Sequence, residues 1–173
     1  GGGSSEIILT EGLEVRLALS IPIGAVRLKE RCWHDDAVPS AEQIDRGNAF
    51  VDSVLDRHLT VPRQAPETET IGLAGTITTL RRMMGAMRNR GEMELLPDCV
   101  TTMANFANLS ARLRTQTPAE IVEDYGIEPD RAEVILGGSL ILLKLMDRLG
   151  VEGLRVMSGG VADGLLQEYL RGI

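Results

Sequence analysis

Aromatic residues are scarce in this chain, since only 3% of its 173 residues are Phe, Trp or Tyr. Apolar residues nevertheless make up 43% of the sequence, so a core must be built mainly from Leu, Ile, Val, Ala and Met. A chain of this length and apolar content can bury one sizeable core. We therefore expect residues 1–173 to form a single domain.

The chain also has few cysteines, fewer basic than acidic residues, and no long apolar run. Cys32 and Cys99 are isolated thiols, which is typical of a reducing cytoplasm rather than of a disulfide scaffold. No apolar run is as long as a membrane span, so we expect a cytoplasmic protein without a membrane partner. Eighteen basic against twenty-five acidic side chains give a net charge of -7, which argues against general nucleic-acid binding.

The order of predicted elements is mixed α/β. Apolar alternation predicts a hairpin, while capping boxes and apolar periodicity predict several helices. Strands are expected at 6–10, 13–21, 70–74 and 154–157, and helices at 41–59, 75–87, 98–113, from 118, at 129–149 and at 161–171. Residues 24–31 fit either a helix or a strand.

The first residues are candidates for a phosphate site. Gly1, Gly2 and Gly3 leave backbone amides free to turn toward an anion, and Ser4 adds a hydroxyl donor. Glu6 follows closely enough to hold a metal ion or a water beside that anion. A phosphate loop usually follows a strand, so this beginning leads us to expect the downstream half of a larger protein. The same composition is typical of a flexible linker, and these residues alone leave both interpretations open.

Two later turns join a strand to a helix. Gly75 and Thr76 begin a predicted helix, where the amides and the helix dipole favour an anion. Ser158, Gly159 and Gly160 follow the last predicted strand in a similar setting. Each turn also has a purely structural interpretation, with Thr76 capping its helix and the glycines making an ordinary turn. The pair Gly137-Gly138 lies inside an apolar helix and indicates close packing.

Two charged groups are weaker candidates. A basic group on or after the 75–87 helix fits a solvated face or a surface that attracts a polyanion; its members are Arg81, Arg82, Arg88 and Arg90. A second group has no zinc-binding spacing and does not predict a metal site; its members are Cys32, His34, Asp35 and Asp36.

The order of several segments resembles one family throughout. After the glycine-serine loop come residues 20–30 (SIPIGAVRLKE), 72–80 (GLAGTITTL), 131–138 (RAEVILGG), and 154–156 (LRV) with 163–166 (DGLL). Together they resemble the second actin-like domain of the exopolyphosphatase and guanosine pentaphosphate phosphohydrolase (Ppx/GppA) family. The resemblance covers essentially all 173 residues and favours the phosphate loop over the linker.

The resemblance implies a ribonuclease-H-like α/β domain of the actin-like ATPase superfamily, with a mixed sheet flanked by helices. A first domain, absent from this chain, would face it and supply a catalytic carboxylate. The substrate would be inorganic polyphosphate or a guanosine phosphate, hydrolysed at a terminal phosphoanhydride with Mg²⁺. Glu6 would be catalytic and would order the metal, and the phosphate-binding residues would be Gly1, Gly2, Gly3, Ser4, Gly75, Thr76, Ser158, Gly159 and Gly160.

Some questions stay open at this level. Many family members carry Ser at position 157 and a basic residue at 162, where this chain has Met157 and Ala162. A non-catalytic member that binds polyphosphate or a guanosine alarmone is the alternative, and a kinase of the wider superfamily is a third option. The sequence does not choose between the two substrates, and it leaves open whether the protein forms a homodimer.

Overall fold

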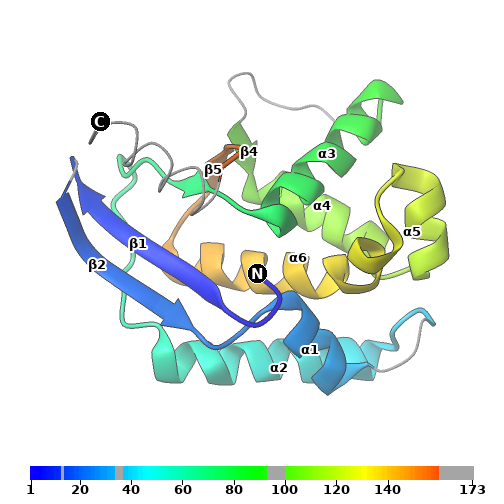
Figure 1. The fold of residues 1–173 in the computed structure, drawn as a ribbon, viewed down its shortest axis with the longest axis horizontal. Coiled ribbons are helices and arrows are strands. Elements are labelled where there is room, and N and C mark those ends of the chain that lie inside the picture. Colours follow the sequence, from blue (N-terminus) through cyan, green and yellow to red (C-terminus); the bar gives the residue numbers. More distant parts are fainter. Residues whose placement is uncertain (13, 34–36, 93–99, 160–173) are drawn as a thin grey trace, which may run out of the picture.

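A computed structural model describes residues 1–12, 14–33, 37–92 and 100–159 of the chain. Two small sheets and six helices alternate along these residues, which confirms the mixed α/β class (Figure 1). The elements are β1 (Ser5–Glu11), β2 (Glu14–Ile21), α1 (Ala25–Cys32), α2 (Ala41–His58), β3 (Ile71–Gly72), α3 (Gly75–Asn89), β4 (Val100–Thr102), α4 (Met103–Leu113), α5 (Pro118–Tyr125), α6 (Pro129–Leu149) and β5 (Gly153–Val156).

The predicted hairpin is present as the antiparallel pair β1–β2. Glu6 lies opposite Ser20, and a register shift between Leu9 and Thr10 marks a bulge. Side chains alternate between half-buried and exposed along the second part of β2, as the apolar pattern predicts. The interpretation fails nearer the turn, where Val15 is 62% exposed.

The second sheet has the order β3-β5-β4, with β3 parallel and β4 antiparallel to β5. It differs from the sequence prediction in two places. The expected strand 70–74 shortens to the two residues of β3. Ile71 in this strand and Leu73 just after it are about half exposed. The expected helix 98–113 begins only at Met103, because Val100–Thr102 pairs with β5.

Capping chemistry places most helix ends where the sequence predicts them. Ser40 and Thr117 form the predicted capping boxes at the start of α2 and α5, and Thr102 forms a further one, not predicted, at the start of α4. Residues 24–31, which left two choices open, form the helix α1. The expected helix at 161–171 lies outside the described residues.

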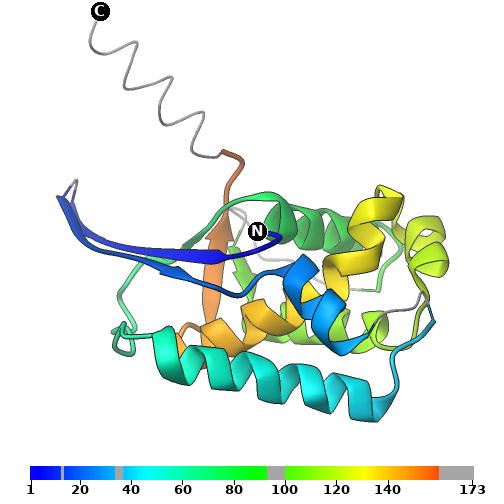
Figure 2. The same ribbon diagram turned by 60° about the horizontal axis from the view of Figure 1, so that its bottom comes forward.

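Helix α6 is the centre of the packing. It contacts α1, α2, α3, α4 and α5, and the two views show it running between the α1–α2 pair and the α3–α4 pair (Figures 1 and 2). Gly137 and Gly138 are buried in it, as predicted: a β-carbon at Gly137 would lie 3.1 Å from the Ala25 carbonyl oxygen. Small residues here let neighbouring helices approach the α6 backbone closely.

Candidate anion site at the glycine loop and the first turn of α3

The N-terminal glycine loop is fixed against the start of α1. The amide of Ala25 donates to the Gly1 carbonyl at 3.0 Å, and the amides of Val26 and Arg27 donate to the Gly2 carbonyl at 3.1 and 3.2 Å. These carbonyls satisfy helix amides that no side chain caps. A β-carbon at Gly24 would overlap the Gly2 carbonyl, so glycine is needed there. The space where a β-carbon would stand at Gly3 is open.

Glu6 lies in β1 directly after this loop, with its side chain exposed. Its Oε1 accepts a hydrogen bond from the Ser4 hydroxyl at 2.5 Å and from the Ser20 hydroxyl, across the strand pair, at 3.2 Å. The Ser4 hydrogen bond is the main reason that the pKa of Glu6 falls below its usual value; partial burial opposes it and the Ser20 bond adds to it. Glu6 is therefore a carboxylate at neutral pH.

Among the described residues, no group accepts from the first amides of α3. Its N-cap residue is Ala74, and no side chain caps this end, so the structure corrects the interpretation of Thr76 as the cap. Thr78 instead donates its hydroxyl to the carbonyls of Ala74 and Gly75, both at 3.2 Å. Ala74 has φ 72° and ψ 171°, a conformation that costs a non-glycine residue about 1–3 kcal/mol. Uncapped amides at the positive end of a helix dipole favour an anion.

A guanidinium group lies beside the same turn. A β-carbon at Gly75 would lie 2.6 Å from one Nη of Arg131, so the arginine side chain occupies that space. Arg131 belongs to the first turn of α6, and it forms no ion pair with any residue that the structure describes. Its charge therefore adds to the positive end of α3.

Gly138 joins the loop and the turn. A β-carbon at this position would overlap the Thr76 methyl carbon and lie 3.5 Å from the β-carbon of Ala25. Ala25 in turn holds the Gly1 carbonyl through its amide. The first turn of α3 and the start of α1, whose amides hold the glycine loop, thus pack on the same glycine of α6. We predict that the Cα atoms of Gly3 and Gly75 lie within about 10 Å of each other, a span that a bound phosphate and its donors could bridge.

The third predicted turn opens at the same sheet edge as the second. Strands β3 and β5 are parallel neighbours, and the amide of Met157 donates to the Gly72 carbonyl at 3.1 Å. Ser158 and Gly159 therefore leave the sheet beside the Leu73–Gly75 turn, with the Ser158 side chain exposed. Gly160 lies outside the described residues.

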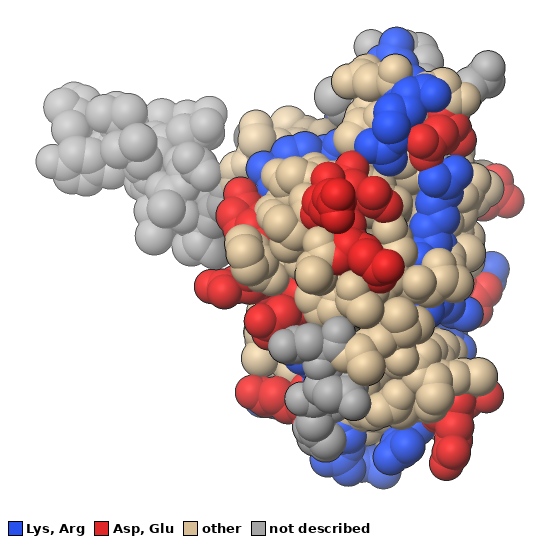
Figure 3. Space-filling view, turned by 90° about the vertical axis from the view of Figure 1, so that its right-hand side faces the viewer, with Lys and Arg blue, Asp and Glu red and all other residues tan. Residues whose placement is uncertain are grey.

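The other charged groups do not extend this site. Arg82 pairs with Glu128 at 3.0 Å and Arg90 with Glu92 at 2.7 Å, so the basic group at α3 is partly neutralised. Acidic and basic side chains lie intermixed on the face at the α5 end of the molecule (Figure 3). Within the described ranges no cluster of three His, Cys, Asp or Glu side chains could hold a metal, and His34–Asp36 fall outside those ranges. No described helix is long and apolar enough to cross a bilayer.

Sequence reasoning missed two residues of this site. Ser20 could have been found from the hairpin register, which sets it opposite Glu6. Arg131 gave no such signal, because only the packing of α6 against α3 brings it to Gly75.

Fold and site together define an α/β protein that presents a carboxylate and an uncapped helix N-terminus around one packing point. The profile of the Ppx/GppA phosphatase family matches residues 1–172, and the chain belongs to that family. It is 34% identical over 170 residues to exopolyphosphatase 2 of Mycobacterium tuberculosis, covering 95% of this chain and 52% of that protein. It is 25% identical over 171 residues to the guanosine-5'-triphosphate,3'-diphosphate pyrophosphatase of Vibrio cholerae, covering 99% of this chain and 33% of that protein.

Solved structures agree with this assignment. The crystal structure of the Aquifex aeolicus Ppx/GppA family member matches with a TM-score of 0.80 and 29% identity, over 99% of this chain and 55% of that one. An exopolyphosphatase from Cytophaga hutchinsonii matches with a TM-score of 0.79 at 22% identity, over all of this chain and 55% of that one, which supports the fold. The chain spans about half the length of these structures.

Proposed function

We propose that this chain is the second domain of a two-domain enzyme that hydrolyses terminal phosphoanhydride bonds of inorganic polyphosphate, of guanosine pentaphosphate, or of both. Membership of the family and the partial coverage of its longer relatives support this. The observation that carries the proposal is the packing of the α3 turn and of the start of α1, which holds the glycine loop, on Gly138. This arrangement supports a site in which one phosphate chain would meet donors from both segments.

In this proposal the amides of the glycine loop and of the α3 turn bind the substrate phosphates, and a carboxylate activates the attacking water. The amides of Gly1, Gly2 and Gly3 and those of Gly75 and Thr76 would hold phosphoryl oxygens. Arg131 would add a charge-assisted hydrogen bond at the α3 side, since its planar fork suits phosphate. The missing first domain would supply the carboxylate that activates the attacking water.

Glu6 and the two serines hydrogen-bonded to it offer oxygen atoms that suit a hard cation. Magnesium prefers oxygen ligands, is usually held by one or two carboxylates together with substrate phosphates, and would neutralise charge on the phosphates when bound. Glu6 offers a carboxylate, and Ser4 and Ser20 offer hydroxyl oxygens beside it. Because the Ser4 hydroxyl donates its hydrogen bond to Glu6, only its lone pairs are left for a further partner; this differs from the donor role expected from the sequence.

Other parts of the proposal rest on the resemblance alone. Ser158 and Gly159 would contact the distal part of the substrate, with Met157 and Ala162 altering those contacts relative to many family members. The cytoplasmic location, a second copy of the protein as a partner and the absence of nucleic-acid binding stay predictions.

Phosphate release by the intact protein tests the proposal, with Glu6→Gln as the informative variant. We expect activity on polyphosphate or guanosine pentaphosphate in the presence of Mg²⁺, and a loss of roughly 10²-fold in kcat on losing the carboxylate. Stability should change by less than about 0.5 kcal/mol, as for an exposed side chain. Glu123→Gln is the matched control, since Glu123 is exposed on α5 away from the loop.

The result separates the two candidate functions. Activity that survives in Glu6→Gln while its stability falls would show that Glu6 is structural. Equal loss of activity in both variants would show that the effect is not specific to the Glu6 carboxylate. Tight binding of either substrate by the wild type without phosphate release would favour the regulatory, non-catalytic member.

A further inference from the structure

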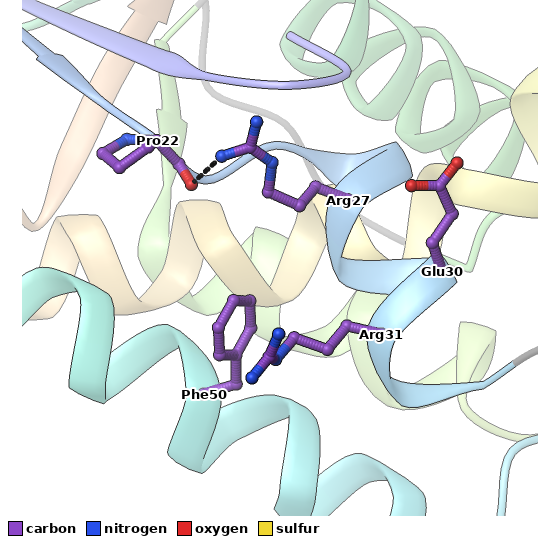
Figure 4. A pocket seen from close by; sticks show the side chains of 5 residues that line it. All are labelled: Pro22, Arg27, Glu30, Arg31 and Phe50. Carbon is purple, nitrogen blue, oxygen red and sulfur yellow. Dashed lines mark hydrogen bonds between the residues drawn. The ribbon is translucent and has the colours of Figure 1, made fainter.

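A shallow hollow of about 670 Å³ opens between the end of β2, α1 and α2. It is lined by Pro22, Arg27, Glu30, Arg31 and Phe50 (Figure 4). Arg27 and Arg31 are one helical turn apart on α1, so their side chains share a face. Figure 4 shows both extending toward the Pro22 and Phe50 side, whereas the Glu30 carboxylate points away from them.

Both guanidinium groups keep donors for a ligand. Arg27 donates from Nη1 to the Pro22 carbonyl at 2.9 Å, and the centre of the Arg31 guanidinium lies 4.5 Å from the centroid of the Phe50 ring. Neither arginine forms an ion pair with a carboxylate in the part of the chain that the structure describes. Two arginines against the single carboxylate of Glu30 give this hollow a positive balance in a chain of net charge -7, which makes it attractive to an anion.

The two contacts also hold the arginines in place. Stacking on Phe50 restricts Arg31, and the bond to Pro22 restricts Arg27, so less side-chain entropy is lost when an anion binds. Arginine forks donate in pairs to phosphate oxygens. The volume lies within the usual range of ligand sites, and its open shape suits one part of a long ligand better than a small enclosed one.

The hollow adjoins the glycine loop. The backbone amide of Arg27, whose side chain lines the hollow, donates to the Gly2 carbonyl at 3.2 Å. A polyanion with its end at the glycine loop therefore passes within reach of Arg27 if it continues along α1.

We propose that this hollow is a second phosphate subsite, which binds phosphate groups of a polyphosphate chain beyond its hydrolysed end. The inference rests on the function proposed above and adds a preference for chain length. Hydrolysis of a short substrate needs only the loop and the α3 turn, whereas a long chain gains the contacts to Arg27 and Arg31.

Steady-state kinetics of the intact protein test this with tripolyphosphate and with long-chain polyphosphate. In Arg27→Gln/Arg31→Gln, KM for the long chain should rise roughly tenfold, which corresponds to the loss of about one charge-assisted hydrogen bond. KM for tripolyphosphate and kcat for both substrates should stay within about twofold. Arg27→Lys/Arg31→Lys keeps the charge without the fork and should give an intermediate KM.

A second double variant controls for net charge. Arg57→Gln/Arg114→Gln removes the same charge from exposed positions at the ends of α2 and α4. An equal rise in KM in this control would overturn the subsite, because bulk charge would explain the effect. An equal rise for short and long substrates in the hollow variant would also overturn it.

Thermal melting of each variant shows that it is folded, and the single variants Arg27→Gln and Arg31→Gln replace the double one if it is not. A wild-type protein that hydrolyses neither substrate would overturn the proposed function and this inference with it. An active wild type whose hollow variant keeps its long-chain KM would overturn this inference alone.

Discussion

Replacing Gly138 by alanine tests the contact that joins the two halves of the candidate site. Gly138 is buried in α6, and an added β-carbon would overlap the methyl carbon of Thr76. Thr76 is short and β-branched, so it cannot swing aside as the end of a long side chain can. Either Thr76 changes its χ1 rotamer, or the first turn of α3 moves away from α6.

The size of the effect follows from two opposed contributions. Alanine is favoured over glycine in a helix interior by about 1 kcal/mol. An extra carbon forced into a packed interface typically costs about 1–3 kcal/mol. We therefore expect the free energy of unfolding of Gly138→Ala to fall by about 1 kcal/mol, equivalent to a decrease in Tm of about 2–4 °C for a chain of this size.

Gly85 provides the matched control within the same chain. It lies inside α3, and apart from its own helix turn no described atom lies within 4 Å of the position of an added β-carbon. Gly85→Ala should therefore stabilise the protein by about 1 kcal/mol. The same substitution at two helix positions is thus expected to have opposite signs.

Denaturant unfolding of a double-mutant cycle isolates the contact. Thr76→Ser removes the overlapping methyl group, so Gly138→Ala in that background should be neutral or stabilising. We expect a coupling energy of about 1–3 kcal/mol between the two positions. Stabilisation of the wild type by Gly138→Ala, to the extent seen at Gly85, would refute the close contact and with it the shared packing of the α3 turn and the start of α1 on Gly138.

Three further changes test other parts of the site. Ser4→Ala removes the main cause of the lowered pKa of Glu6, so that pKa should rise and the acid limb of the rate profile should move to higher pH. The stability that the lowered pKa of Glu6 contributes is present above its unfolded pKa near 4.5 and is lost as pH falls through the lower folded value. Ser4→Ala and the wild type should therefore converge in stability in acid. Ala74→Gly should raise the free energy of unfolding by about 1 kcal/mol in denaturant titrations. Relief of backbone strain, about 1–3 kcal/mol, exceeds the entropic cost of glycine, about 0.5–1 kcal/mol. A fall in the free energy of unfolding would show that Ala74 is unstrained. The isolated chain should fold but release no phosphate from polyphosphate, since the proposed cleft needs a second domain; turnover near that of the intact protein would contradict this.

Local chemistry explains the elements that could be predicted. Ser40 with Gln43, and Thr117 with Glu120, satisfy helix amides from within three residues, so these helix starts can be read directly from sequence. Helix α6 begins at Pro129 and ends before Gly150, which adopts φ 73°. Both residues act through their own backbone geometry, which does not depend on the rest of the fold.

The elements that were wrong depend on distant partners. The sequence predicts a helix over 98–113, yet Val100–Thr102 pairs with β5 some fifty residues later. Thr76 looked like a cap, but its methyl group packs against Gly138, and Ala74 takes the N-cap position instead. Neither the β4–β5 pairing nor the contact of Thr76 with Gly138 produces a recognisable pattern in the neighbouring sequence.

The sequence by itself determined the family, most helix ends, the hairpin, and Glu6 with its glycine loop as the first candidate site. The helix ends and the hairpin arise from contacts between near neighbours in the chain, whose geometry the residue types largely set. Only the tertiary structure decided that Arg131 lies at Gly75, and that the α3 turn and the start of α1 pack on one glycine. Such contacts join residues far apart in the chain, and they form only when close helix packing on α6 brings the segments together.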